Sequence, residues 1–356
     1  MKFGVCVMAN IDEIGFFSHA EMLGYNSVWA TDSQMLFSDC YAVLALAAKQ
    51  TTKLKLGTGT SITGTRIPPV HVAAAATLNR IAPGRIHIGI GTGNTAMRTM
   101  GQRPMKIAEY RDYLKVLAAL LRGEIVDYAY NGVTRRISML MHDETGYMNL
   151  KPKIPLYVSG FGPRAMGLAG EFGDGLVFAI PPRGVGVAES MAHVRQGAAS
   201  AGRDVGCGFL NCALTNIGLL EPGEAVDSDR VKRLVGPNVM ASVYYFYDEV
   251  HERGVEVPDF LKPMWKRYCA LVEETAPEIR HLRTHEFHYT NLHPGEAELI
   301  DAELIRATCV IGVAEELVDQ IKALEAEGLQ EIMFATGVSE KWSFAEDFAR
   351  QVMSKF

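Results

Sequence analysis

The chain has 356 residues, of which 48% are hydrophobic and 21% are charged, and its formal net charge is -6. This length and balance are typical of a globular protein with a large core, and they exclude an intrinsically disordered chain. The acidic balance, without any Lys/Arg cluster longer than a pair, argues against nucleic acid as a partner.

Six cysteines are spread along the chain without a Cys-x-x-Cys pair, so neither a zinc knuckle nor a redox dithiol is indicated. We expect reduced, mostly buried thiols. Asp12 and Glu13 interrupt the N-terminal apolar stretch, unlike the core of a signal peptide, and no apolar run reaches the roughly 18 residues of a membrane span. The sequence therefore predicts a cytoplasmic protein without membrane contact.

Apolar runs rich in Val, Ile and Phe alternate with segments in which apolar residues recur every three or four positions. Near-continuous apolar strands, each followed by a helix, are typical of a parallel sheet covered by helices. Eight such units favour a closed α/β barrel, the (β/α)8 TIM barrel, over an open sheet. In chain order the predicted strands are 3–8, 27–31, 54–62, 85–91, 155–159, 175–179, 208–219 and 331–335, and the predicted helices are 11–23, 40–50, 70–81, 104–122, 163–172, 187–201, 314–327 and 343–354.

The segment 124–153 interrupts this alternation between the fourth and fifth strands. It contains the dipeptides Asn131-Gly132 and Thr145-Gly146, which are turn signals between short strands. We expect a small β-hairpin beside the barrel.

A larger interruption spans 221–308, between the seventh strand and the last helices, and carries helical patterns at 229–252 and 258–274. Barrel strands all end at one rim, and the loops at that rim carry the functional residues. We therefore predict one barrel domain over the whole chain, 1–356, in which 221–308 forms a helical insertion, or lid, over the rim.

Small and polar residues follow four of the predicted strands at the point where each strand ends. They lie at 31–33, 57–61, 91–94 and 159–164. Because the C-terminal ends of barrel strands meet at one rim, these segments should lie together although they are distant in sequence. Their glycines would let the backbone approach a ligand closely, so we expect a ligand site there.

The glycine-rich turn at 89–94, Gly-Ile-Gly-Thr-Gly-Asn, allows several interpretations. A Rossmann dinucleotide fingerprint is disfavoured, because Asn94 occupies the third glycine position and three strand-helix units precede it. A P-loop is excluded, since no Gly-Lys-Ser/Thr follows. A tight turn without a ligand remains open, as does one wall of a shared pocket, which Thr92 and Asn94 would face.

Motifs at five places carry a resemblance to a known family: 24–32, 56–60 with 65–68, 77–91, 155–160 and 168–175. Jointly they resemble the bacterial luciferase-like flavin monooxygenases over nearly the whole chain. The resemblance implies a TIM barrel that holds flavin mononucleotide (FMN) at its C-terminal rim. The chain would then be one part of a two-component monooxygenase, in which a separate flavin reductase supplies reduced FMN and oxygen reacts with a small organic substrate.

Two alternatives remain open. In a sister branch of the family the cofactor is a deazaflavin coenzyme and the reaction is hydride transfer. The chain could also be a non-catalytic flavin-binding protein. Because the helices of this family commonly pair, the resemblance also implies a homodimer or a homotetramer.

The resemblance assigns cofactor-binding residues as well. A non-proline cis peptide, here Gly59-Thr60, supports the middle ring of the flavin. Thr92 stands where luciferase itself has a phosphate-binding arginine, a departure for which Arg164 could compensate. The phosphate cradle falls on Ser159, Gly160, Phe161, Gly162, Pro163 and Arg164, with the helix that begins at Pro163 directing its first N–H groups toward the phosphate.

Asp32 and His288 are the candidate catalytic residues. Many relatives carry a histidine directly after the acidic residue of the second strand, where it is proposed as a base, but this chain has Ser33. Asp32 could hydrogen-bond the ring or the substrate, or it could cap the following turn or helix. His288 lies in the insertion, where it could face the ligand.

Two further clusters in the insertion have less specific interpretations. His281, His285, His288 and His293 could hold a metal, but the family uses none and no matching carboxylate spacing is present, so we expect no metal. The aromatic run 244–247 could line a substrate pocket, although core packing is the commoner role of such a stripe.

Overall fold

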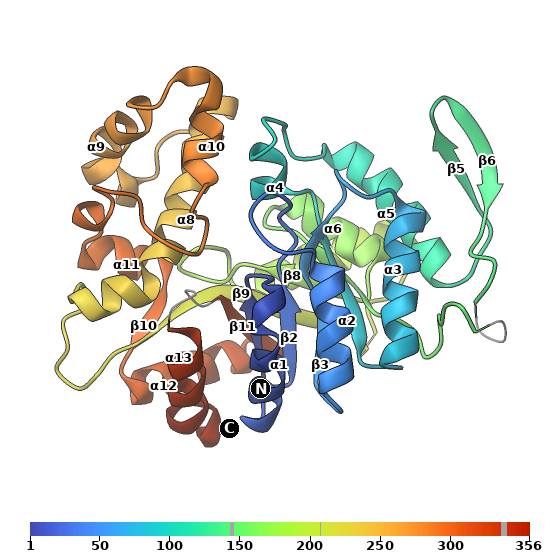
Figure 1. Cartoon of the computed structure of the whole chain (residues 1–356), viewed down its shortest axis with the longest axis horizontal. Coiled ribbons are helices and arrows are strands. Elements are labelled where there is room, and N and C mark those ends of the chain that lie inside the picture. The colour runs from blue at the N-terminus through green and yellow to red at the C-terminus, as the bar shows by residue number, and fades with distance from the viewer. Residues whose placement is uncertain (143–145, 207, 336–339) are drawn as a thin grey trace.

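The computed structural model describes residues 1–142, 146–206, 208–335 and 340–356. Within them, eight parallel strands form a closed ring, because β8 pairs with β9 and so joins the ends of the sheet. The chain is therefore a TIM barrel, and all eight predicted strands are present (Figure 1). The barrel strands are β1 (Lys2–Val7), β2 (Ser27–Ala30), β3 (Lys55–Ile62), β4 (Ile86–Gly91), β7 (Leu156–Ser159), β8 (Gly175–Phe178), β9 (Leu210–Leu219) and β11 (Glu331–Ala335).

Helices cover the outside of this ring (Figure 1). β2 and β4 are buried along their whole length, which explains their continuous apolar sequences. The covering helices are α1 (Gly15–Met22), α2 (Cys40–Gln50), α3 (Pro68–Ile81), α5 (Ile107–Leu121), α6 (Pro163–Phe172), α7 (Val187–Ser200), α12 (Ala314–Ala326) and α13 (Lys341–Gln351). Short elements are α4 (Asn94–Arg98) and the 3-10 turns Ile11–Glu13, Asp259–Leu261, Pro277–Ile279, Ala297–Leu299 and Met353–Lys355.

Side chains fill the inside of the barrel. Trp29 is fully buried there, with its ring centroid 3.9 Å from that of His87 and 5.1 Å from that of Tyr157. A filled interior leaves the rim as the place for a ligand. The apolar members of this inner cluster are Cys6, Met8, Trp29, Tyr157, Val177, Cys212, Met333 and Ala335.

The predicted hairpin is present as β5 (Val126–Tyr130) paired with β6 (Val133–Ile137). Its turn has left-handed backbone at Asn131 (φ 50°) and Gly132 (φ 76°), the conformation for which Asn-Gly is selected. The hairpin extends away from the barrel beyond α5 (Figure 1). Thr145, in the second predicted turn, lies outside the described residues.

A helical insertion separates β9 from α12 and forms the upper left part of Figure 1. The helical patterns at 229–252 and 258–274 correspond to its first two helices. A short strand, β10, pairs with β9 and was not predicted, because three residues form too short a pattern. The elements are α8 (Asp229–Arg253), α9 (Lys262–Glu273), α10 (Arg280–His285), α11 (Ala302–Thr308) and β10 (Val310–Gly312).

In the part of the chain that the structure describes, no helix has both the length and the apolar character needed to cross a membrane.

Candidate functional site

Thr60, Gly91 and Ser159 meet at the C-terminal ends of β3, β4 and β7. A Cβ placed on Gly91 would stand 2.8 Å from Thr60 Oγ1 and 3.5 Å from Ser159 Cβ. The two predicted cofactor-binding side chains therefore lie beside the same glycine, and only a hydrogen atom occupies the place of a side chain between them. The Gly59–Thr60 peptide bond is cis, as the resemblance implied.

The loop after β7 leads into the N-terminus of α6. Gly162 is the N-cap residue and makes no side-chain cap hydrogen bond, so the first N–H groups of α6 have no capping partner. Gly160 packs closely on the helix, since a Cβ there would stand 2.8 Å from the backbone carbon of Ala165. Phe161 and Arg164 are exposed. Such a terminus suits an anion, and the phosphate role of this loop stays a prediction.

The glycine turn after β4 opens α4. Gly93 has left-handed backbone (φ 85°), and α4 begins at Asn94. Asn94 Oδ1 accepts a hydrogen bond from Arg98, so this oxygen already has a partner within the helix. Thr92 is half-buried beside the same turn. The ligand-facing role predicted for Thr92 and Asn94 stays a prediction.

Asp32 is buried just after β2, with only 5% of its surface exposed. Its Oδ2 accepts hydrogen bonds from Ser61 Oγ at 2.7 Å and from Arg66 Nη1 at 2.5 Å. The same oxygen accepts from the N–H of Ile62 at 3.3 Å, and the Cys40 thiol also hydrogen-bonds the carboxylate. Asp32 does not cap α2, because Asp39 accepts from the first N–H groups of that helix.

His71, a residue that the sequence did not single out, extends this network into the protein. It is fully buried on α3, with Nε2 3.1 Å from Ser61 Oγ and Nδ1 in contact with the Tyr113 hydroxyl. Burial, and then the nearby Arg66, lowers the pKa of His71 to about 3, so the ring is neutral. The sequence could have indicated this network, because Arg66 and His71 follow soon after the third predicted strand.

His288 brings the insertion to the rim. Its Nε2 lies 3.1 Å from Oγ1 of Thr95, on α4, while its Nδ1 is buried without a hydrogen-bond partner among the described residues. Burial, followed by the charges of His285 and Arg183, holds the pKa of His288 well below its usual range. A neutral imidazole with one free nitrogen is thus placed next to the glycine turn.

The other three histidines of the insertion have separate surroundings. Nε2 of His285 lies 3.1 Å from Asp248 Oδ2, and the ring of His293 packs on Phe287 with centroids 4.5 Å apart. His281 lies near Gly101. Across the described ranges, no group of three or more His, Cys, Asp or Glu residues is arranged to hold a metal ion.

Arg98 joins the rim to the insertion. This α4 residue is 4% exposed and contacts three acidic residues of α8: Asp248 at 3.1 Å, Glu252 at 3.0 Å and Glu249 at 3.6 Å. Breaking a buried, multiply paired charge is costly, so this cluster holds the insertion against the barrel.

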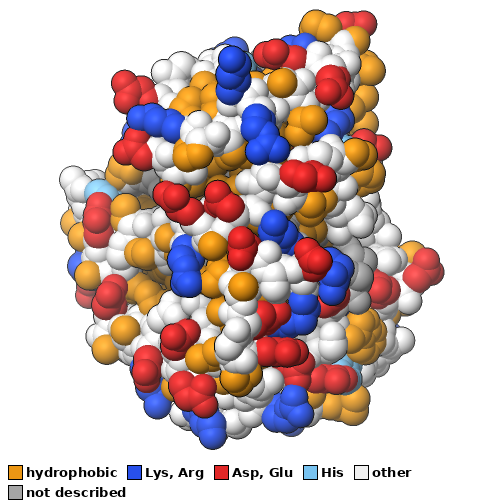
Figure 2. Space-filling model, turned by 90° about the vertical axis from the view of Figure 1, so that its left-hand side faces the viewer, with side chains coloured by type: hydrophobic (Ala, Val, Ile, Leu, Met, Phe, Trp, Pro, Cys, Tyr) orange, Lys and Arg blue, Asp and Glu red, His pale blue; other side chains and the backbone are white. Residues whose placement is uncertain are grey.

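The aromatic run of α8 serves mainly as core. Tyr244 and Tyr247 are buried, and the Tyr244 ring stacks on Tyr268 with centroids 6.2 Å apart. Tyr247 packs edge-on against Tyr268 at 5.6 Å. Figure 2 shows the side of the molecule that includes the insertion, where acidic and basic side chains are intermingled without a continuous basic patch.

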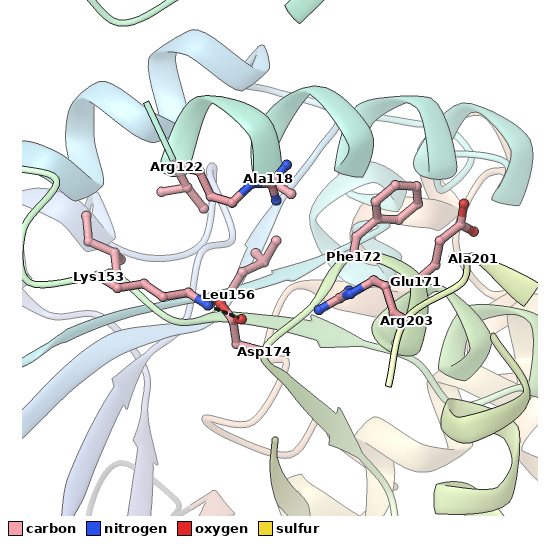
Figure 3. A pocket seen from close by; sticks show the side chains of 11 residues that line it. Ala118, Arg122, Lys153, Leu156, Glu171, Phe172, Asp174, Ala201 and Arg203 are labelled. Atoms are coloured by element: carbon pink, nitrogen blue, oxygen red, sulfur yellow. Dashed lines mark hydrogen bonds and ion pairs between the residues drawn. The ribbon is translucent and has the colours of Figure 1, made fainter. Parts of the chain in front are cut away.

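A cleft of about 570 Å³ lies at the other end of the barrel, where β7 and β8 begin. Arg122, Lys153 and Arg203 line it together with Asp174, and Lys153 pairs with Asp174 (Figure 3). In TIM barrels the N-terminal face serves stability and the C-terminal face carries the chemistry. We therefore place the functional site at the rim and not in this cleft.

The sequence of this chain is similar to those of known proteins. The model of the luciferase-like monooxygenase family matches residues 8–331. A 5,10-methylenetetrahydromethanopterin reductase of Methanolobus tindarius is 30% identical over 190 residues, which cover 52% of this chain and 55% of the reductase. The chain matches 55 to 60% of the length of the first curated relatives. Four further relatives, 25 to 32% identical, are named as enzymes dependent on F420, a deazaflavin.

Solved structures share the fold along the whole chain. The F420-dependent tetrahydromethanopterin reductase from Methanopyrus kandleri has a TM-score of 0.69 and 21% identity, covering 100% of this chain and 99% of the reductase. The oxygenating component of a Baeyer–Villiger monooxygenase from Pseudomonas putida, bound to FMN, has a TM-score of 0.61 and 16% identity, with 100% and 99% covered. At these identities the similarity establishes the fold alone.

Proposed function

The chain belongs to the luciferase-like monooxygenase family, and on that premise we propose that it is an F420-dependent oxidoreductase acting by hydride transfer on a small organic substrate. The curated relatives are named as reductases and dehydrogenases, which supports an enzyme over a flavin-storage protein. The choice of F420 is supported by the curated relatives at 25 to 32% identity that carry this cofactor in their names.

The close approach of Thr60 and Ser159 at Gly91 is the observation that carries the proposal. Because Gly91 has no side chain, Thr60 and Ser159 come together at the ends of their strands, and backbone with short side chains makes a wall on which a flat tricyclic ring can pack. A neighbouring glycine, Gly89, is equally restricted, because a Cβ there would stand 2.3 Å from the carbonyl oxygen of Thr58. These rim residues fit a flavin-type ring.

The phosphate end of the cofactor would lie on the loop from Ser159 to Arg164, at the uncapped N-terminus of α6. A phosphate monoester such as that of FMN carries nearly two negative charges at neutral pH, whereas the phosphodiester of a deazaflavin carries one. Thr92 replaces the arginine that luciferase uses for this phosphate. A site with one fewer cation favours the less charged group.

When bound, a deazaflavin supplies two-electron hydride chemistry without oxygen. The protein's own part is to position the substrate and to exclude water. Asp32 offers a carboxylate in a fixed orientation, because Ser61 and Arg66 hold its Oδ2. His288, neutral and with Nδ1 unpaired, belongs to the insertion that covers the rim.

Gly91→Val tests the placement of the ring. A branched side chain at this position would collide with Thr60 and push Thr60 and Ser159 out of place, so the dissociation constant for F420, followed by its fluorescence, should rise by at least about tenfold. Gly206→Val is the matched control, since a Cβ there meets nothing within 4 Å. Circular dichroism of both variants verifies folding. Unchanged F420 affinity in folded Gly91→Val would rule out this placement.

The second candidate is an FMN-dependent two-component monooxygenase. Fold similarity to the FMN-bound monooxygenase component supports it, with 100% of this chain covered. This candidate requires FMN binding and oxygen uptake that depends on an added flavin reductase. Tight F420 binding without oxygen uptake would exclude it.

A further inference from the structure

Arg183 lies on the rim loop between β8 and α7. A tight turn holds this loop, because the N–H groups of Arg183 and Gly184 both donate to the carbonyl oxygen of Ile180, at 3.0 Å and 2.9 Å. A Cβ on Gly184 would stand 2.0 Å from the carbonyl oxygen of Ala179, so only glycine allows the chain to turn this closely. The turn fixes Arg183 at the C-terminal rim.

The guanidinium group of Arg183 is partly buried and unpaired. Its Nη1 atom is inaccessible to solvent and has no hydrogen-bond partner among the described residues. Arg98 provides the contrast within the same protein, since its buried guanidinium contacts three carboxylates of α8. A buried arginine nitrogen without a partner is unfavourable unless an anion binds it.

The charge of Arg183 acts on several groups of the insertion. Its charge helps to lower the pKa of His288, after burial and His285, and it opposes the rise in pKa that burial causes at Tyr245 on α8 and at Cys309 before β10. The guanidinium therefore lies within electrostatic reach of the insertion, at the seam between it and the rim. His288 Nδ1 is buried and unpartnered in the same part of the molecule.

We propose that Arg183 binds an oxyanion of the ligand in this seam, with His288 as its neutral neighbour, and that the substrate is accordingly an organic acid or a phosphate ester. Arginine suits such groups, since two parallel N–H donors match a carboxylate or a phosphate. The inference rests on the proposed function, because it assigns the seam to the substrate of the F420-dependent reaction.

The oxyanion that Arg183 binds could also belong to the cofactor, because a deazaflavin carries phosphate and carboxylate groups. The loop assigned to its phosphate follows β7 and leads into α6, whereas Arg183 follows the next strand, β8, and lies within electrostatic reach of the insertion. We therefore assign Arg183 to the substrate. Loss of Arg183 should weaken anion binding if the guanidinium binds the substrate, and F420 binding if it binds the cofactor.

The test uses protein saturated with F420, titrated calorimetrically with inorganic phosphate and with acetate in a buffer without other oxyanions. Arg183→Met should weaken binding of the better anion by at least about tenfold, the effect of losing a charge-assisted hydrogen bond. Its dissociation constant for F420 should stay within about twofold of wild type. Arg195→Met, an exposed arginine on α7, is the matched control and should change neither affinity.

Two results would overturn the proposal. One is that wild type binds neither anion, or that Arg183→Met binds the anion as tightly as wild type does. The other is a loss of F420 affinity of about tenfold in Arg183→Met, which would assign the guanidinium to the cofactor. If wild type binds no F420, the proposed function fails separately, and the anion titration on the protein alone still tests Arg183.

Discussion

The Ser61 hydroxyl donates a 2.7 Å hydrogen bond to the carboxylate of Asp32, and it lies 3.1 Å from Nε2 of His71. A carboxylate can only accept, so the single hydroxyl proton of Ser61 is used on Asp32. One hydroxyl thus connects the candidate catalytic carboxylate at the rim to a neutral histidine in the core.

Ser61→Ala should destabilise the protein by about 2 kcal/mol, because it removes a buried hydrogen-bond partner from both Asp32 and His71. Urea denaturation measures this loss. Ser343→Ala, an exposed serine at the start of α13, is the control and should stay within about 0.5 kcal/mol of wild type. Equal stability of the two variants would contradict the network described here.

Stability should fall as the pH drops below 6.5. Burial lowers the pKa of both His71 and His87 from 6.5 to about 3. Above pH 6.5 both histidines are neutral in the folded and in the unfolded protein. Between pH 6.5 and about 3 they bind a proton only in the unfolded chain. The free energy of unfolding should then decrease by up to about 1.4 kcal/mol per pH unit for each histidine.

His71→Gln isolates one of these two contributions. Urea denaturation at about pH 7.5, 6 and 5 should show that the variant takes up about one proton fewer on unfolding than wild type at the lowest pH. The same pH dependence in both proteins would mean that His71 is not held neutral by the fold.

Arg98→Met should loosen the insertion. The substitution leaves Asp248 and Glu252 of α8 without their buried cation, at a cost of about 3 kcal/mol. Hydrogen exchange along α8 should accelerate. Arg253→Met is the matched control, because its side chain is 62% exposed and pairs with Glu249 on the same helix, a contact worth less than about 1 kcal/mol. Equal exchange in both variants would show that Arg98 does not hold the insertion.

The barrel could be predicted because its signals are local. β2 and β4 are buried throughout, so each forms an apolar run that can be recognised from its own residues alone. The Asn131-Gly132 turn was predictable for the same reason, since both residues adopt the left-handed backbone that selects them. β10 was missed because it is short.

The polar network around Asp32 could not be predicted, because it depends on side-chain directions across elements. Arg66 reaches Asp32 from the loop after β3, and His71 reaches Ser61 from α3. Neither contact follows from spacing along the chain. The convergence of Thr60 and Ser159 was predictable in outline, since both residues lie at strand ends on one rim, but their shared contact with Gly91 required the structure.

Equilibrium titration of the purified protein with F420 and with FMN tests the central claim most directly. We predict that F420 binds at least about a hundredfold more tightly than FMN, a difference of about 2.7 kcal/mol in binding free energy. Tight binding of FMN with no detectable binding of F420 would contradict it.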